Sequence, residues 1–273
     1  MRIRDALEQA RTLGVERLDA QLILAHLFDR PRAWLLAHDD EVLEADQAER
    51  LRALLTRRAA SEPLAYVIGH AEFRGLDLMV SPAVLVPRPE TEVLVEWALE
   101  RLPADAAAEV VDLGTGSGAI ALALQRERPR ARITATDASA EALLVARANA
   151  AHHAPAMAFA QGDWWAPLAG RRFALAVSNP PYIAGDDLHL QALGHEPRSA
   201  LTPEGDGLAA LRRIVDQAPA HLQPGAWLLL EHGHDQGDAV RRLLVRRGFA
   251  ATSTRDDLAG LARCSGGCWP SAN

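Results

Sequence analysis

The spacing of apolar residues predicts helices in the first quarter of the chain. Leu, Ile and Ala recur there at three- and four-residue intervals, as on one face of an amphipathic helix. Gly14 and Pro31 stand where such helices should stop. We therefore expect residues 1–70 to form a small all-helical domain. The helical segments are 2–14, 17–29 and 44–61.

The pattern changes between residues 61 and 90. Apolar residues alternate with polar ones around Gly75, and three prolines follow within eight residues. Alternation around a glycine predicts a hairpin, and the prolines predict an extended linker after it. We place the hairpin and linker at residues 71–90.

From Thr91 onward, strand-like apolar runs alternate with helical patterns. The strand-like runs include "EVVDLG", "RITATD", "FALAVS" and "AWLLLE", and a helical pattern follows most of them. Such alternation predicts an α/β domain with a doubly wound, mostly parallel sheet over residues 91–273.

Composition narrows the class of protein. The chain has 273 residues, of which 49% are hydrophobic. Its apolar runs fall short of the roughly 18 residues of a membrane span, and its first residues form no apolar signal region. These features predict a cytoplasmic protein. The net charge of -7 argues against a nucleic-acid duplex as the main partner and favours a protein or small-molecule substrate.

Two cysteines, Cys264 and Cys268, lie in "RCSGGCW" near the C-terminus. On a strand they would face the same side about 13 Å apart, which is too far for an unstrained disulfide. A zinc site would need more Cys or His ligands than this region supplies. We expect two buried thiols, and no metal.

A glycine-rich turn follows the first strand of the α/β domain, in "VVDLGTGSGAIAL". Glycines there let the backbone turn sharply and approach a ligand without a Cβ in the way. Ligands of open α/β sheets bind at this end of the strands. The expected cofactor-binding residues of this turn are Gly114, Thr115, Gly116, Ser117 and Gly118.

Two cofactors fit this turn. Asp137 ends the next strand, where its carboxylate can accept hydrogen bonds from ribose hydroxyls. Both NAD and S-adenosylmethionine carry such a ribose, and the G-x-G-x-G spacing favours the nucleoside without a pyrophosphate. Asp163 and Trp164, in "QGDWWAPL", are candidates for a polar and an aromatic contact with the adenine, although one of Trp164 and Trp165 should belong to the core.

The fourth strand ends in "SNPPY", residues 178–182. A planar amide or aromatic amine is a poor nucleophile, and two acceptors near its N–H groups would help its nitrogen attack a methyl group. The Asn179 side-chain oxygen and the Pro180 carbonyl are the candidate acceptors, held rigid by consecutive prolines. Tyr182 would offer a flat face for stacking. We predict catalysis by positioning, through Asn179, Pro180 and Tyr182.

The sequence resembles the peptide chain release factor glutamine methyltransferases, the PrmC/HemK family. The resemblance is carried by "DLGTGSGAIALAL" and "SNPPY" and by two longer stretches, "EPLAYVIGHAEFRGLDLMVSPAVLVPRPETE" and "HEPRSALTPEGDGLAALRRIV". It covers nearly the whole chain.

The resemblance implies a fold, a reaction and a set of site residues. The fold is a helical N-terminal domain that docks substrate, a hairpin and a seven-stranded methyltransferase domain. The reaction is methylation of the glutamine side-chain nitrogen (N5) in the Gly-Gly-Gln motif of bacterial release factors, with S-adenosylmethionine as donor. The implied cofactor contacts are Gly114 to Gly118, Asp137, Trp164 and Asn179, and the implied glutamine-binding loop is Asn179, Pro180, Pro181 and Tyr182.

Other positions are less closely tied to the family's pattern. Glu196 and Pro197 fall in a loop that would cover the site. The C-terminal "RCSGGCWPSAN" departs from the pattern, at what should be the edge of the sheet.

Three alternative functions are weighed against this interpretation. A DNA adenine N6-methyltransferase would use the same "NPPY" chemistry but needs a basic surface. An NAD-binding oxidoreductase would explain the glycines and Asp137 but leaves "NPPY" without a role. A cofactor-binding module without catalysis would bind the nucleoside and turn nothing over.

Overall fold

The computed structural model describes residues 1–271, which divide into two compact units. The first unit is Met1–His70 and the second begins at Ala71. Among the described residues, no helix has the length and apolar character needed to cross a membrane.

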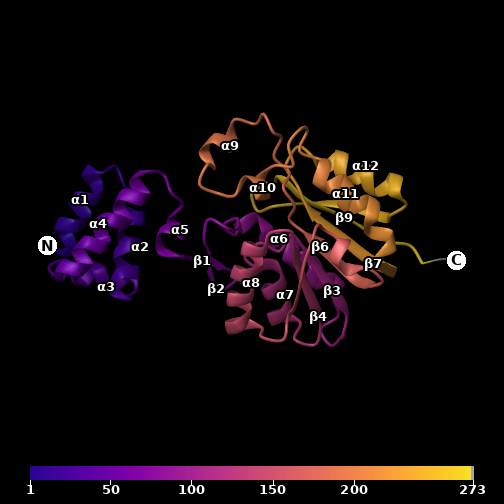
Figure 1. Ribbon diagram of the computed structural model, residues 1–273, viewed down its shortest axis with the longest axis horizontal. Helices are drawn as coiled ribbons and strands as arrows, with labels where there is room; N and C mark the ends of the chain where they lie inside the picture. Colours follow the sequence, from indigo (N-terminus) through magenta and orange to yellow (C-terminus); the bar gives the residue numbers. More distant parts are fainter. Residues whose placement is uncertain (272–273) are drawn as a thin grey trace. The chain divides into compact units, whose positions relative to one another are not determined.

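The first unit is a bundle of five helices around its own core (Figure 1). Its largest buried side chains include Ile3, Leu24 and Leu55. An ion pair of 2.6 Å joins Arg58 on α4 to Asp19 on α2. The predicted all-helical character is confirmed. The helices are α1 (Ile3–Thr12), α2 (Arg17–Phe28), α3 (Arg32–Ala37), α4 (Ala45–Ala59) and α5 (Leu64–Ile68).

The stretch 61–90, in which the sequence pattern indicated a hairpin and a linker, also contains the short helix α5. Pro63 precedes its first turn, where a missing N–H costs nothing, and Gly69 ends it at φ +82°. Arg57 donates a 2.9 Å hydrogen bond to the Tyr66 carbonyl oxygen and so ties α5 to α4. Five residues are too few to show a helical period in the sequence.

The predicted hairpin is confirmed as β1 (His70–Phe73) and β2 (Leu76–Met79), joined through Arg74 and Gly75. Gly75 has φ +73°, a conformation that glycine adopts without strain. After a short 3-10 helix, Pro89–Thr91, the chain forms α6 (Glu92–Arg101), a helix that the sequence pattern did not single out.

The α/β domain contains a seven-stranded sheet in the order β5-β4-β3-β6-β7-β9-β8, as Figure 1 shows for its central strands. All neighbouring strands from β5 to β7 are parallel, and β9 is antiparallel to both of its neighbours. The predicted doubly wound, mostly parallel architecture is confirmed. The strands are β3 (Glu109–Leu113), β4 (Arg132–Asp137), β5 (Ala158–Gln161), β6 (Phe173–Ser178), β7 (Leu222–Glu231), β8 (Ala250–Asp256) and β9 (Ala262–Cys268).

The sequence analysis placed the C-terminal segment at the edge of the sheet, and this is wrong. The strand β9 lies between β7 and β8. Its glycines are a packing requirement, since a Cβ on Gly266 would collide with the Leu229 side chain and lie 2.9 Å from the Leu228 carbonyl oxygen. Both cysteines are free, as predicted. Cys264 is buried, but Cys268 is only half-buried, so the expectation of two buried thiols is half wrong.

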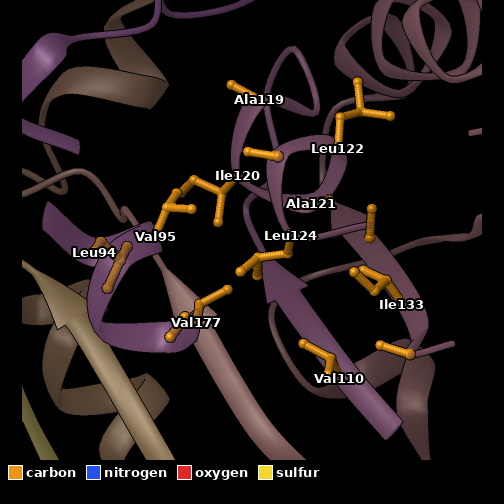
Figure 2. Packing of buried hydrophobic residues seen from close by; sticks show 14 of the residues in the cluster. Leu94, Val95, Val110, Ala119, Ile120, Ala121, Leu122, Leu124, Ile133 and Val177 are labelled. Atoms are coloured by element: carbon orange, nitrogen blue, oxygen red, sulfur yellow. The ribbon is translucent and has the colours of Figure 1, made fainter. Parts of the chain in front are cut away.

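Helices cover both faces of the sheet, and the strand residues alternate between two hydrophobic clusters. Val110 and Val177 face the cluster under α6, α7 and α8, while Val111 and Ala176 face the cluster under α11 and α12. Figure 2 shows side chains of α6, α7 and three strands meeting in the first cluster. The helices are α7 (Ala119–Glu127), α8 (Ala140–His153), α9 (His189–Ala192), α10 (Arg198–Leu201), α11 (Ala209–Gln217) and α12 (Gly237–Arg247).

Candidate functional site

A cavity of about 300 Å³ lies at the carboxyl ends of β3, β4 and β6, where the sheet order reverses. Ligands of doubly wound sheets bind at such a reversal. On the sheet side it is lined by residues 114–117 of the glycine turn, Asp137, Trp164 and Asn179. Most residues of the stretches 82–88 and 197–200 complete its wall.

The glycine turn is held open by backbone hydrogen bonds. The amides of Gly114 and Thr115 both donate to the Thr136 carbonyl oxygen, at 2.9 and 2.8 Å. Gly116, at φ +54°, has no atom within 4 Å of where a Cβ would stand. The backbone can therefore approach a ligand closely here. Gly118 does not line the cavity, because it begins α7 and packs on Leu122.

Asp137 joins the glycine turn to the end of β4. One carboxylate oxygen accepts from the Gly116 amide and the other from the Ser139 amide, both at 2.9 Å. Burial raises the pKa of Asp137. Each carboxylate oxygen keeps a further lone pair, so the side chain can also accept hydroxyl donors from a ligand in the cavity.

A second carboxyl group, Asp112, is completely buried beneath the glycine turn. Its Oδ2 accepts a 2.6 Å hydrogen bond from the Thr115 hydroxyl, and its Oδ1 has no partner. Removal from water raises its pKa to about 7. Asp112 does not line the cavity and supports the turn from below.

The tandem tryptophans divide between the cavity and the core. Trp164 lines the cavity, and its ring would lie 3.1 Å from a Cβ on Gly114. The Trp164 backbone has a φ of +50°, which is strained for a residue with a large side chain. Such a conformation persists only where the surrounding structure holds it in place. Trp165 is buried and donates a 3.0 Å hydrogen bond to the Ile214 carbonyl oxygen. Asp163 also lines the cavity and forms an ion pair with Arg213.

The "NPPY" loop begins where β6 meets β3. The Ser178 hydroxyl donates a 2.6 Å hydrogen bond to the Leu113 carbonyl oxygen, which fixes the end of the strand. Asn179 lines the cavity, and its Nδ2 donates to Thr91 Oγ1 at 3.3 Å. The amide oxygen of Asn179 is thereby left free to accept from a ligand.

The structure does not bring every predicted residue of this loop to the cavity wall. Asn179 and Pro181 line the cavity, whereas Pro180 and Tyr182 do not. The Tyr182 hydroxyl donates to Glu231 Oε1 at 3.2 Å, and Gln236 donates to the Tyr182 carbonyl oxygen at 2.9 Å. Burial raises the pKa of Tyr182, so the phenol stays protonated and acts as a donor.

The linker after the hairpin is fastened to the loop that follows β6. Glu196 is 6% exposed, and its carboxylate accepts a 3.1 Å hydrogen bond from the Val86 amide and forms an ion pair with Arg88. Pro197 lines the cavity beside it. Two segments 110 residues apart in the sequence thus form one wall of the site.

Sequence reasoning missed three polar residues at and behind the cavity wall. Thr91, Glu231 and Asn149 are all buried, and of these three only Thr91 lines the cavity. Asn149 exchanges hydrogen bonds with the Met79 backbone and donates to the Ser117 carbonyl oxygen at 2.9 Å. The one sequence signal that could have pointed to Glu231 is its place at the end of the apolar strand "AWLLLE", because an isolated charge is costly inside a protein.

Two family models match the chain. The methyltransferase small domain matches residues 91–208, and the PrmC N-terminal domain matches residues 1–69.

Curated relatives match over almost the whole length. The chain is 52% identical over 268 residues to the release factor glutamine methyltransferase of Xylella fastidiosa (strain Temecula1), covering 97% of this chain and 98% of that protein. It is 49% identical over 257 residues to the protein of the same name from Bordetella pertussis (strain Tohama I), covering 93% and 95%.

Solved structures share the fold at low sequence identity. A methyltransferase from Pyrococcus furiosus aligns with a TM-score of 0.55 and 17% identity, over 84% of this chain and all of that one. The 16S rRNA N2 G1207 methyltransferase of T. thermophilus aligns with a TM-score of 0.54 and 20% identity, over 73% of this chain and 49% of that one.

Proposed function

The chain belongs to the release factor glutamine methyltransferase family, and on this premise we propose which substrate it uses and which residues act. The substrate is the glutamine of the Gly-Gly-Gln motif in bacterial peptide chain release factors, methylated on its side-chain nitrogen N5. Methylation of this motif would act on translation termination, in the cytoplasm where release factors work.

One observation carries the proposal: the glycine turn and Asn179 lie in the wall of the same cavity, at the adjacent carboxyl ends of β3 and β6. A methyl donor and an amide can therefore meet there. The near full-length relatives favour glutamine methylation over the DNA adenine methyltransferase and oxidoreductase alternatives.

The residues of the cavity fit S-adenosylmethionine. The open face of Gly116 admits close backbone contact, the Asp137 carboxylate is placed for ribose hydroxyls, and the Trp164 ring offers an aromatic face to the adenine. When bound, S-adenosylmethionine supplies an electrophilic methyl group, whose bond to sulfur breaks as its bond to the amide nitrogen forms, leaving a neutral thioether.

Asn179 orients the glutamine amide in this proposal. Its Oδ1 accepts one N–H of the substrate amide, and the Pro180 carbonyl oxygen takes the other, so that the nitrogen lone pair is directed at the methyl group. The Asn179 side chain already lines the cavity before substrate arrives, and such preorganisation is how a site lowers a barrier. The methylated nitrogen loses its proton to solvent, and no strong general base is needed.

Protein contacts outside the cavity would provide most of the substrate affinity. We assign that role to the helical domain of residues 1–70 and to the hairpin and linker of residues 71–90. The methyltransferase domain of residues 91–273 would hold the cofactor. The glycines of the substrate motif let its backbone follow the glutamine into the site.

Intact-mass spectrometry of unmethylated release factor, incubated with the protein and S-adenosylmethionine, tests the function. We expect a gain of one methyl group, absent when the substrate glutamine is replaced by alanine. No gain, while the cofactor still binds, would contradict the proposal and direct the search to nucleic-acid substrates. A gain that persists in the alanine substrate would place the methyl group on another residue.

A further inference from the structure

The prolines of the "NPPY" loop cannot fasten it to the rest of the fold through their own amides. Pro180 and Pro181 have no backbone N–H, so neither can donate a hydrogen bond to a neighbouring segment. Before the prolines, the Ser178 hydroxyl fixes the end of β6 through its 2.6 Å hydrogen bond to the Leu113 carbonyl oxygen. After the prolines, other residues must hold the chain if the loop is to keep one orientation.

The first peptide group after the prolines, between Tyr182 and Ile183, is held on both sides. Its carbonyl oxygen accepts a 2.9 Å hydrogen bond from Gln236 Nε2, and its N–H donates to the Leu201 carbonyl oxygen at 3.0 Å. Two hydrogen bonds in opposite directions fix the plane of this peptide group. The loop is therefore fastened at Ser178 before the prolines and at this peptide group after them.

Gln236 reaches the loop from the position that precedes the first turn of α12. Its Oε1 accepts a 2.9 Å hydrogen bond from the Gly233 amide, while its Nε2 donates to Tyr182. These two partners decide the orientation of the Gln236 amide, because the reverse would place two donors together at Gly233 and two acceptors together at Tyr182. One side-chain amide thus links the segment after β7 to the "NPPY" loop.

The segment before α11 leaves room for this hydrogen bond. A Cβ on Gly207 would collide with the Tyr182 carbonyl oxygen and would lie 2.9 Å from Gln236 Nε2. The hydrogen bond is partly buried, so water competes less for the Tyr182 oxygen than it would at the surface. Three segments of the α/β domain therefore meet at the Tyr182 carbonyl group.

We infer that Gln236 is a positioning residue that holds the "NPPY" loop through the carbonyl group of Tyr182. The loop is thereby kept in the orientation in which Asn179 and Pro180 receive the substrate amide. The inference rests on the proposed glutamine methylation. Gln236 itself does not line the cavity, so it acts on the reaction through the loop and not by touching cofactor or substrate.

An isosteric substitution removes the hydrogen bond to Tyr182 alone. Gln236→Glu keeps an oxygen for the Gly233 amide, but an ionised carboxylate only accepts and therefore repels the Tyr182 carbonyl oxygen. The peptide group would turn away, and the acceptors for the substrate amide would move with it. Because a displacement of about 1 Å at a reacting group can cost about 100-fold in rate, we expect the loss to appear in kcat.

The test measures kcat and KM for release factor, and the Kd of S-adenosylmethionine, in the full-length protein at pH 8, where an ordinary glutamate is ionised. Gln236→Glu should lower kcat by about 10- to 100-fold, while KM and Kd change less than about threefold. Gln236→Met keeps the length of the side chain without a charge or a strong hydrogen bond, and kcat should fall in this variant also. Melting temperatures check that each variant is folded.

Gln223→Glu is the matched control. Gln223 also donates its Nε2 to a backbone carbonyl oxygen, that of Arg172 at 3.2 Å, but it lies at the opposite end of β7 from the cavity. The substitution removes the same kind of hydrogen bond and should leave kcat unchanged.

A double-mutant cycle tests whether Gln236 acts through the loop. In the Asn179→Ala background one of the two acceptors for the substrate amide is already gone, so Gln236→Glu should lower kcat by a smaller factor there than in the wild type. Losses of equal size in both backgrounds would show that the two side chains act independently and would overturn the inference.

Three further results would overturn it: wild-type kcat in a folded Gln236→Glu, a loss that appears in Kd or KM rather than in kcat, or an equal loss of kcat in Gln223→Glu. Failure of both Gln236 variants to fold would show that this residue serves the fold as a whole and would also overturn it. If the wild type itself leaves the glutamine unmodified, the proposed function fails together with the inference. An active wild type with an equally active Gln236→Glu contradicts the positioning role alone.

Discussion

Asn179 combines three constraints in one residue. Pro180 restricts its backbone, Thr91 takes one of its N–H groups, and its side chain lines the cavity. We expect Asn179→Ala to lower kcat/KM for release factor by at least about 100-fold, since it removes a preorganised acceptor at the reacting nitrogen. Steady-state kinetics, with the melting temperature as a control for folding, checks this. Near-wild-type turnover would exclude Asn179 from the reaction.

The buried Asp112 carboxyl leads us to predict how the free energy of unfolding depends on pH. Its pKa of about 7 lies above its ordinary value of 3.8, so between these pH values the native state holds a proton that the unfolded chain has lost. The free energy of unfolding should therefore fall as pH rises from about 4 to 7, by about 4 kcal/mol at most from this group. Above pH 7 its contribution no longer changes.

Asp112→Asn removes that titration while keeping an acceptor for the Thr115 hydroxyl. Urea unfolding at pH 5 and pH 8 should show a smaller loss of stability with pH in the variant than in the wild type. Glu231, whose pKa is also raised to about 7, leaves a residual slope of the same sign in both proteins. If the free energy of unfolding falls equally with pH in both proteins, Asp112 is not the buried acid responsible for that fall.

At the scale of elements, Asn149 joins three parts of the fold. From α8 it bonds the Met79 backbone at the end of the hairpin and the Ser117 carbonyl oxygen in the glycine turn. Asn149→Leu would leave these buried groups unpaired. It should cost about 2–4 kcal/mol of stability and weaken cofactor binding.

Calorimetric titration of the cofactor and chemical unfolding measure the two effects of Asn149→Leu. Asn149→Asp can still accept from the Met79 amide but cannot donate, so it should fall between wild type and Asn149→Leu. If Asn149→Leu is destabilised but binds the cofactor with unchanged affinity, the link from the hairpin through Asn149 to the glycine turn does not support cofactor binding.

The position of β9 inside the sheet makes Gly266 a packing residue. A Cβ there meets a backbone oxygen at 2.9 Å as well as the Leu229 side chain, so Gly266→Ala must shift a strand. We expect a loss of about 1–3 kcal/mol, measured by thermal unfolding. Gly194→Ala is the control, because its Cβ would lie 3.6 Å from the nearest atom on an exposed loop. Equal stabilities of the two variants would contradict this packing role.

At the scale of the whole molecule, we predict different roles for the two units. The first has its own hydrophobic core, and every residue lining the cavity belongs to the second. Deleting residues 1–70 should leave the Kd of S-adenosylmethionine within about threefold while raising KM for release factor at least about tenfold. Titration calorimetry measures the Kd, and methyl-transfer kinetics measure the KM. A truncated protein with wild-type KM would place substrate docking elsewhere.

Local sequence patterns were sufficient for much of this architecture. The helical periods of the first domain, the alternation of strand and helix after Thr91, and the hairpin around Gly75 each depend on residues close in sequence, and the structure confirms them. The glycine turn and "NPPY" were visible for the same reason, because each is one short segment at the end of a strand.

Elements that lack a long period escaped that analysis. The five residues of α5 are defined by a proline before them and a glycine after them, not by a repeated apolar face. The place of β9 in the sheet could not be predicted, because strand order depends on which strands pair across the fold.

The sequence by itself determined the family, the class of reaction and two of the short segments that line the cavity. Only the tertiary structure decided that Trp164 lines this cavity while Trp165 is buried, that Glu196 fastens the linker, that Asn179 bonds Thr91, and that Tyr182 bonds Glu231. The physical reason is distance along the chain: 88 residues separate Thr91 from Asn179 and 49 separate Tyr182 from Glu231, and only folding brings such side chains within hydrogen-bond reach.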